Sequence, residues 1–183
     1  MKNRHIQEYL DLTSTQSFLV CANELVQFLE TPDMSMNISD YLRLLERKLA
    51  KVYAVWLELE IIKITYDFGK PTNPNKLKGV DYSILTKLEE NAFYCDVFNP
   101  ICYNTYIQNE NLEAIWTEVT QWYLFDDISD IYNDICPHLD ALKSSKKPWE
   151  IEDALFQLCF WFKHHWWKHC IDALRFLYHY NRN

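Results

Sequence analysis

Glycine is almost missing from this chain of 183 residues, which contains only Gly69 and Gly79. A loop that holds a phosphate group against its backbone needs several glycines, as does the turn that binds a dinucleotide. Tight hairpin turns between strands also depend on glycine. The sequence therefore excludes both kinds of nucleotide-binding loop and disfavours an all-β fold.

The chain also lacks the segments that would direct it to a membrane or to an oxidising compartment. Its N-terminus has no apolar run of the signal-peptide kind, and no stretch reaches the roughly 18 apolar residues of a membrane span. The six cysteines include no Cys-x-x-Cys pair, and we interpret them as reduced, mostly buried thiols. These absences predict a soluble, cytoplasmic protein that does not bind a membrane.

Positive charge is scarce, and the net charge is −8. From Lys143 onward there are seven basic and four acidic residues, whereas the part up to Leu142 has 11 basic and 22 acidic residues. An acidic body repels nucleic acid phosphates, and the small basic excess of the C-terminal part does not reverse this repulsion. We therefore expect no nucleic-acid partner.

What the chain has in quantity is apolar and aromatic side chains, which make up 49% and 16% of its residues. A chain of this length and composition can form a sizeable core without disulfides or metal ions. We expect one helical domain over residues 1–183, with a mobile loop at about 67–80 around the two glycines.

The spacing of the apolar residues predicts an all-α fold, an antiparallel bundle of about five to seven helices. Thr13 and Gln16 have the spacing of a capping box at the start of the first helical region. The five regions begin at Thr13, near Asn37 or Ser39, at Asp81, at about Asn111 and at Pro148. The fourth should run to Leu142 and the last to about Tyr180.

An acidic cluster lies in the fourth region, at Asp126, Asp127, Asp130 and Asp134. Two interpretations of this cluster are open. If the helix breaks near Phe125, the aspartates form the solvated face of a separate amphipathic helix. If it continues, they extend a buried stripe from Trp116 and need a cation or hydrogen-bond donors.

A second cluster contains His165 and His169, which are four residues apart and share one helical face. Two imidazoles at this spacing can bind one divalent metal ion, with carboxylates completing the site. Alternatively, both histidines only form hydrogen bonds within a buried helix. If the fourth and last regions pack antiparallel, the histidines could face Asp127, Asp130 or Asp134, and these five residues are the candidate metal ligands.

The two clusters together resemble a bacterial family, the domain-of-unknown-function family numbered 5063. The resemblance depends on Asp126-Asp127-Ile-Ser-Asp130-Ile-Tyr132-Asn-Asp134 and on Phe160-Trp-Phe-Lys-His-His165-Trp166-Trp-Lys-His169, followed by Asp172-Ala-Leu-Arg175. A third, weaker block is Tyr94-Cys-Asp-Val-Phe-Asn-Pro100. The resemblance implies an all-helical fold in a bacterial, cytoplasmic protein, and it supplies no reaction.

The sequence leaves open whether the protein is an enzyme. The first hypothesis is a non-enzymatic module that binds a protein partner, a second copy of itself or a small ligand, because aromatic residues often anchor interfaces. The alternative is a metal-dependent hydrolase that uses the acidic helix and the histidine helix. A cysteine-based redox enzyme is least favoured, since only Cys170 lies beside a histidine.

No cofactor is predicted apart from a divalent metal. The remaining residues of the candidate functional cluster are Asp126, Tyr132, Trp166, Asp172 and Arg175.

Overall fold

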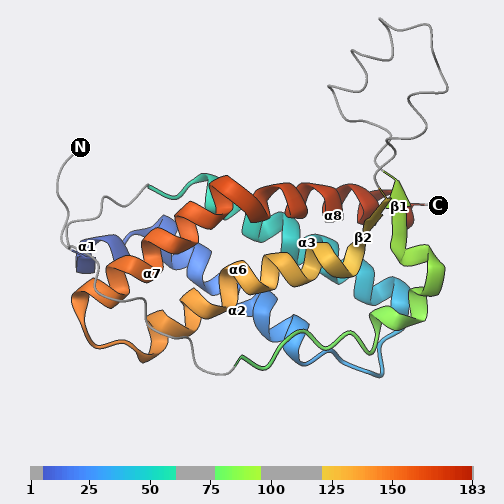
Figure 1. Ribbon diagram of the computed structural model, residues 1–183, viewed down its shortest axis with the longest axis horizontal. Coiled ribbons are helices and arrows are strands. Elements are labelled where there is room, and N and C mark those ends of the chain that lie inside the picture. Colours follow the sequence, from blue (N-terminus) through green and yellow to red (C-terminus); the bar gives the residue numbers. More distant parts are fainter. Residues whose placement is uncertain (1–5, 61–76, 96–120, 183) are drawn as a thin grey trace, which may run out of the picture.

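The computed structural model describes residues 6–60, 77–95 and 121–182 of the chain, and within these ranges the fold is all-α apart from two short strands (Figure 1). The helical segments are α1 (Ile6–Leu10), α2 (Thr13–Glu30), α3 (Ile38–Leu57), the 3₁₀ helix η1 (Leu85–Ala92), α6 (Leu124–Ser144), α7 (Pro148–Trp161), the π-helical η2 (Phe162–Trp166) and α8 (Trp167–Tyr180). The expected helical bundle is confirmed.

The start of α3 follows directly from its sequence. The side chain of Asn37 accepts a hydrogen bond from the backbone N–H of Asp40 at 2.8 Å, which is the usual role of asparagine before the first helical turn. At the start of α2 the expected capping box is wrong. The residue before the helix is Leu12, no side chain caps it, and Gln16 donates instead to the backbone carbonyl of Leu10.

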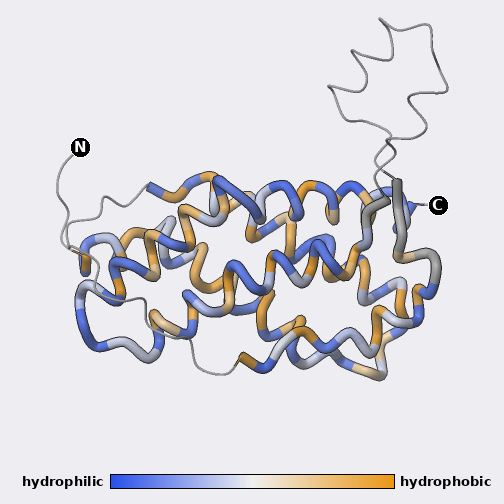
Figure 2. The backbone as a smooth tube through the Cα atoms, in the orientation of Figure 1, coloured by the Kyte–Doolittle hydropathy of each residue, from blue (hydrophilic) through white to orange (hydrophobic). Residues whose placement is uncertain are grey.

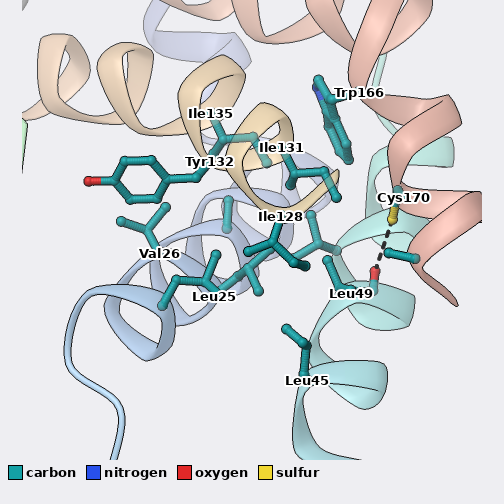
Figure 3. Packing of buried hydrophobic residues seen from close by; sticks show 14 of the residues in the cluster. Leu25, Val26, Leu45, Leu49, Ile128, Ile131, Tyr132, Ile135, Trp166 and Cys170 are labelled. Atoms are coloured by element: carbon teal, nitrogen blue, oxygen red, sulfur yellow. Dashed lines mark hydrogen bonds between the residues drawn. The ribbon is translucent and has the colours of Figure 1, made fainter. Parts of the chain in front are cut away.

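The core lies between α2, α3, α6 and α8. Figure 3 shows Ile128, Ile131 and Ile135 of α6 among core residues of α2 and α3 and Trp166, with Cys170 next to Leu49 of α3. All three isoleucines are fully buried, and each such side chain contributes roughly 1.5–3 kcal/mol relative to an exposed one. Figure 2 shows hydrophilic and hydrophobic segments alternating along the helices, as expected when each helix has one inner face.

The last helical region is continuous from α7 through η2 to α8, and it runs along one edge of the bundle (Figure 1). Its observed limits, Pro148 and Tyr180, match the prediction. The α8 helix contacts both α3 and α6, and α7 contacts α6. This arrangement places the histidine segment against the acidic segment of α6.

The fourth helical region differs from its prediction. The α6 helix begins at Leu124, and Gln121–Tyr123 before it form strand β2, which pairs antiparallel with β1 (Phe93–Cys95). The predicted start at about Asn111 lies outside the described residues. The helix does not extend back through Trp122, so the interpretation with a break near Phe125 is the correct one at this point.

The region that connects α3 to η1 is described from residue 77. The mobile loop expected at about 67–80 therefore lies mostly outside the described residues. Gly79 has a φ angle of +88°, which side-chain-bearing residues rarely adopt, so the turn requires glycine there.

Within the described ranges, no helix combines the length and the apolar character that a membrane span requires.

Candidate metal centre

The aspartates of α6 do not share one environment. Asp126 is exposed, Asp130 and Asp134 are half-buried, and Asp127 is only 1% exposed. The solvated-face interpretation therefore holds for Asp126 and is wrong for Asp127. A buried carboxylate needs partners that replace water, and α8 supplies them.

Two histidine–aspartate pairs join α6 to the histidine segment. Nδ1 of His165 lies 2.7 Å from Oδ2 of Asp134, and Nδ1 of His169 lies 2.8 Å from Oδ1 of Asp127. Asp130 lies between the pairs, with its Oδ2 at 3.4 Å from Nε2 of His169. The two clusters that the sequence places about 30–40 residues apart thus meet in space, as the expected packing of the two helices requires.

The pairs differ in how far water reaches them. The side chains of His169 and Asp127 are 12% and 1% exposed, whereas that of His165 is 42% exposed. The hydrogen bond that His169 donates to Asp127 raises the pKa of His169, and burial opposes this effect only in part. Burial raises the pKa of Asp134, although His165 beside it acts in the opposite direction. The inner pair therefore favours an imidazolium when no other cation is present.

Three of these residues bring metal-binding atoms together. One donor atom each from Asp130, His165 and His169 lie within 4.8 Å of one another. Since each histidine uses Nδ1 for an aspartate, Nε2 is the ring nitrogen available to a ligand. Histidines that bind metals commonly have this arrangement, in which a carboxylate fixes the ring orientation and increases its basicity. The five candidate ligands thus divide into three residues that can bind the ion directly, Asp130, His165 and His169, and two carboxylates that hold the imidazole rings, Asp127 and Asp134.

His165 lies in η2, a π-helical turn from Phe162 to Trp166. Such turns are rare, and they occur frequently at functional sites because one extra residue changes which side chains face a neighbour. The rings of His165 and His169 are 4.7 Å apart, so both histidines face the same acidic surface across this turn. No local sequence signal predicted the π turn.

Comparison with known proteins identifies the family. The profile of the family described as "Domain of unknown function (DUF5063)" matches residues 12–182. The chain belongs to the DUF5063 family. The match includes α2 and α3 as well as the two clusters on which the resemblance rested.

A solved structure shows the same fold. The crystal structure of protein BF1032 from Bacteroides fragilis superposes with a TM-score of 0.66 and 19% sequence identity, and the match covers 93% of each chain. At this identity the similarity concerns the fold alone. No curated protein matches the sequence.

Other candidate residues of this DUF5063 chain lie elsewhere. The hydroxyl of Tyr132 donates to Oε1 of Glu30 at 2.8 Å and accepts from the backbone N–H of Gly79 at 3.1 Å. Figure 3 shows this hydroxyl pointing away from Trp166. Burial raises the pKa of Tyr132, so it stays protonated and joins α2, α6 and the turn at Gly79. Glu30 could not be predicted from the sequence, because its partner Tyr132 is 102 positions away.

Trp166 and Asp172 are buried, whereas Arg175 is half-exposed. Trp166 packs edge-on against Phe162, with ring centroids 4.4 Å apart, and it belongs to the core. Asp172 adds to the negative potential at His169 and helps to raise the pKa of that histidine. The candidate functional cluster is therefore not one site: Asp172 contributes to the centre formed by the two histidines, whereas Tyr132 and Trp166 lie apart from it.

Cys170 is the cysteine beside His169, and it points into the core. Its Sγ lies 3.8 Å from the carbonyl oxygen of Leu49 (Figure 3), and burial raises the pKa of the thiol to about 12. A nucleophilic or redox-active cysteine has a lowered pKa and access to solvent. Cys170 has neither property.

Proposed function

We propose that this DUF5063 chain is a non-enzymatic helical module whose ligand is a divalent transition-metal ion. The ion binds Nε2 of His165, Nε2 of His169 and a carboxylate oxygen of Asp130. Asp127 and Asp134 hold the two imidazoles through Nδ1. The observation that carries the proposal is the convergence of three donor groups within 4.8 Å while both Nδ1 atoms are already bound to carboxylates.

The donor set selects the class of metal. Imidazole nitrogens suit zinc, iron, nickel and copper, whereas magnesium and calcium prefer sites made only of oxygen. A tetrahedral zinc ion with bonds of about 2.1 Å places its ligand atoms roughly 3.4 Å apart. The donor atoms lie within 4.8 Å of one another, so binding zinc would require the side chains to move closer together. We therefore expect Zn²⁺ or Fe²⁺ to bind in preference to Mg²⁺.

Charge balance also favours a cation at this place. Three aspartates of α6 face two histidines, and Asp127 is almost completely buried. A buried carboxylate is stabilised by an opposite charge, which protonated His169 supplies at low pH. A divalent ion supplies this positive charge when both histidines are neutral. Bound metal would thus connect α6 and α8 without leaving an unbalanced buried charge.

The experiment that tests the proposal is thermal unfolding of chelator-treated protein with Zn²⁺, Mn²⁺, Fe²⁺ or Mg²⁺. An ion at about 100 times its dissociation constant stabilises the fold by about 2.7 kcal/mol. For a chain of this length the melting temperature should rise by roughly 5–10 °C. His165→Ala, His169→Ala and Asp130→Asn should remove the rise, and calorimetry should give a stoichiometry of one ion.

The matched control is His164→Ala, which removes the exposed neighbour of His165 and should leave the metal effect unchanged. If no ion shifts the melting temperature, the histidine–aspartate pairs are structural contacts and the proposal is wrong. A shift that survives both histidine substitutions would place the ion elsewhere and would equally contradict it.

A metal-dependent hydrolase is the second candidate. The observation that favours it is the exposure of the outer part of the centre, where the side chains of His165 and Asp130 are 42% and 39% exposed. Three protein ligands with solvent access leave room for a metal-bound water, the nucleophile in such enzymes. Hydrolysis of a p-nitrophenyl phosphate ester by the metal-loaded protein, lost in Asp130→Asn, would support this candidate. Metal binding without hydrolysis would support the binding module.

A further inference from the structure

An exposed aromatic surface lies directly beside the candidate metal centre. Trp161 and Phe160 are 36% and 37% exposed, and their rings meet edge-on with centroids 5.4 Å apart. Trp161 also lies edge-on to His165, with centroids 6.3 Å apart. Neither Trp161 nor Phe160 belongs to the buried core of the described residues. Trp161 therefore offers ring surface that the core does not use, next to a proposed metal ligand.

The helix places this surface at the solvent side of the centre. Trp161, His165 and His169 follow one another at intervals of four residues, so they lie one above the other along the same helical segment. The rings of His165 and His169 are 4.7 Å apart, and Trp161 borders His165 at its other end. The side chains of His165 and Asp130 are 42% and 39% exposed. A molecule that enters the centre from solvent is thus within reach of Trp161.

The protein ligands leave room for such a molecule on the ion. Asp130, His165 and His169 contribute one donor atom each. A tetrahedral ion with three protein ligands takes its fourth ligand from solvent or from another molecule. The fourth ligand is therefore the part of the centre that the chain itself does not determine.

Charge restricts the chemistry of this fourth ligand. A divalent ion would face three carboxylates, that of Asp130, which binds it, and those of Asp127 and Asp134, which hold the imidazole rings. The centre thus has an excess of negative charge before a fourth ligand binds, and the whole chain has a net charge of −8. A carboxylate, phosphate or thiolate would increase this excess in a partly buried place, whereas an uncharged donor would not.

We infer that the centre binds a small, uncharged nitrogen heterocycle that carries an aromatic group, an inference that rests on the proposed metal function. The heterocycle would give the lone pair of its ring nitrogen to the ion, and the aromatic group would pack on Trp161 and Phe160. Aromatic rings attract one another beyond the effect of the area that they bury.

The acid–base properties of nitrogen donors favour a heterocycle over an alkyl amine. An alkyl amine is protonated near neutral pH and has no free lone pair, because its pKa resembles the value of about 10.4 of lysine. A ring nitrogen of the imidazole class is free above about pH 6.5. It also suits the same transition metals as the histidines of the centre. The heterocycle is thus both uncharged and able to bind the ion under the same conditions.

The test is calorimetric titration of the zinc-loaded, full-length protein with 4-phenylimidazole at about pH 8. We expect this compound to bind at least about ten-fold more tightly than 4-methylimidazole, which has the same donor without the aromatic group. It should also bind at least about ten-fold more tightly than benzoate, which has the aromatic group and an anionic donor. Removal of zinc with a chelator should weaken its binding by at least about ten-fold.

Variants of Trp161 assign the preference to its ring. Trp161→Ala should abolish the preference for 4-phenylimidazole over 4-methylimidazole, whereas Trp161→Phe should retain most of it. Both variants should keep the rise in melting temperature with Zn²⁺, because Trp161 does not bind the ion. The matched control is Trp149→Ala, which removes a tryptophan that is 43% exposed near the start of the same helix. This control should bind both imidazoles like the parent protein.

Failure of this inference can be distinguished from failure of the proposed function. If Zn²⁺ does not change the melting temperature, the metal function fails and the inference fails with it. If zinc binds, four results overturn the inference alone. These are equal binding of the two imidazoles, benzoate binding as tight as that of 4-phenylimidazole, unchanged binding after removal of zinc, and a preference that survives Trp161→Ala.

Discussion

Asp127 and His169 form the most buried charged contact between α6 and α8. Their atoms are 2.8 Å apart, and neither side chain is more than 12% exposed. The hydrogen bond that His169 donates to Asp127 raises the pKa of His169, so the folded state binds a proton more tightly than the unfolded state does. The pair therefore makes the stability of the metal-free protein depend on pH.

The direction of this dependence follows from the raised pKa. Below the unfolded value of about 6.5, protonated His169 contributes its full stabilisation. The contribution is lost as the pH rises through the higher pKa of the folded state. In chelator-treated protein, the difference in free energy of unfolding between the parent and His169→Gln should therefore shrink as the pH rises from about 6.5. Urea denaturation at several pH values measures it.

His179→Gln is the control for that series, because His179 is exposed near the end of α8 and no aspartate pairs with it among the contacts of the described residues. The free energy of unfolding of this variant should change with pH in the same way as that of the parent protein. If the free energy of unfolding of His169→Gln also followed that of the parent protein at every pH, the contact with Asp127 would not favour the imidazolium.

Tyr132 and Tyr41 give a matched pair of buried hydroxyl groups. The hydroxyl of Tyr132 contacts the carboxylate of Glu30, whereas that of Tyr41 has no hydrogen-bond partner within the described part of the chain. Tyr132→Phe should lower the free energy of unfolding by about 1.5–3 kcal/mol, the range for hydrogen bonds to charged groups. Tyr41→Phe should change it by less than about 0.5 kcal/mol. Equal losses in the two variants, measured by chemical denaturation, would contradict this assignment.

At the scale of elements, the π turn divides one long helical segment into α7 and α8. Before the turn, α7 packs on α6, and after it α8 packs on both α3 and α6. The turn directs Phe162 and Trp166 into the core, where Phe162 stacks on Trp56 of α3. Trp167 follows immediately and points to the outer face. Two adjacent tryptophans thus have opposite environments because a helix turns by about 100° per residue.

This contrast predicts unequal costs for the two substitutions. Trp166 is fully buried, so Trp166→Ala should lower the free energy of unfolding by about 3–5 kcal/mol. Trp167 is 40% exposed, and Trp167→Ala should cost about 1 kcal/mol. Denaturant unfolding of both variants gives the comparison. Similar costs would mean that the outer face of α8 is covered in the folded protein.

For the whole molecule, the uneven distribution of charge is the main electrostatic feature. The part up to Leu142 has a net charge of −11, whereas the part from Lys143 onward has +3. An ion pair joins the two parts where Arg182 contacts Glu46 at 3.0 Å. Attraction between the two parts stabilises the fold, and repulsion within the larger acidic part destabilises it.

Repulsion should dominate because the net charge is −8. Raising the salt concentration from about 0.01 M to about 0.1 M shortens the screening length from roughly 30 Å to 10 Å. The melting temperature of the metal-free protein should therefore rise with sodium chloride over this range, as differential scanning calorimetry can measure. A fall would show that the ion pairs between the two parts outweigh the repulsion.

The sequence by itself determined most of the helices and the apolar stripe along each of them. Burial of apolar residues imposes a period of about 3.6 on a helix, and the row from Leu42 to Val52 carries that period without any tertiary information. Asn37 and Pro148 marked helix starts because their side chains act within one turn of the backbone. The last helical region and its limits followed from the same local rules.

Only the tertiary structure decided the rotation of each helix and the contacts between distant residues. The sequence could not assign Asp127 to a buried position and Asp126 to solvent, because each helix can rotate about its axis until its neighbours are placed. The same holds for Tyr132, whose partner Glu30 belongs to another helix. The π turn and strand β2 also escaped prediction, since they depend on how α7, α8 and β1 pack. Local chemistry determines which elements form, and packing determines which side chains meet.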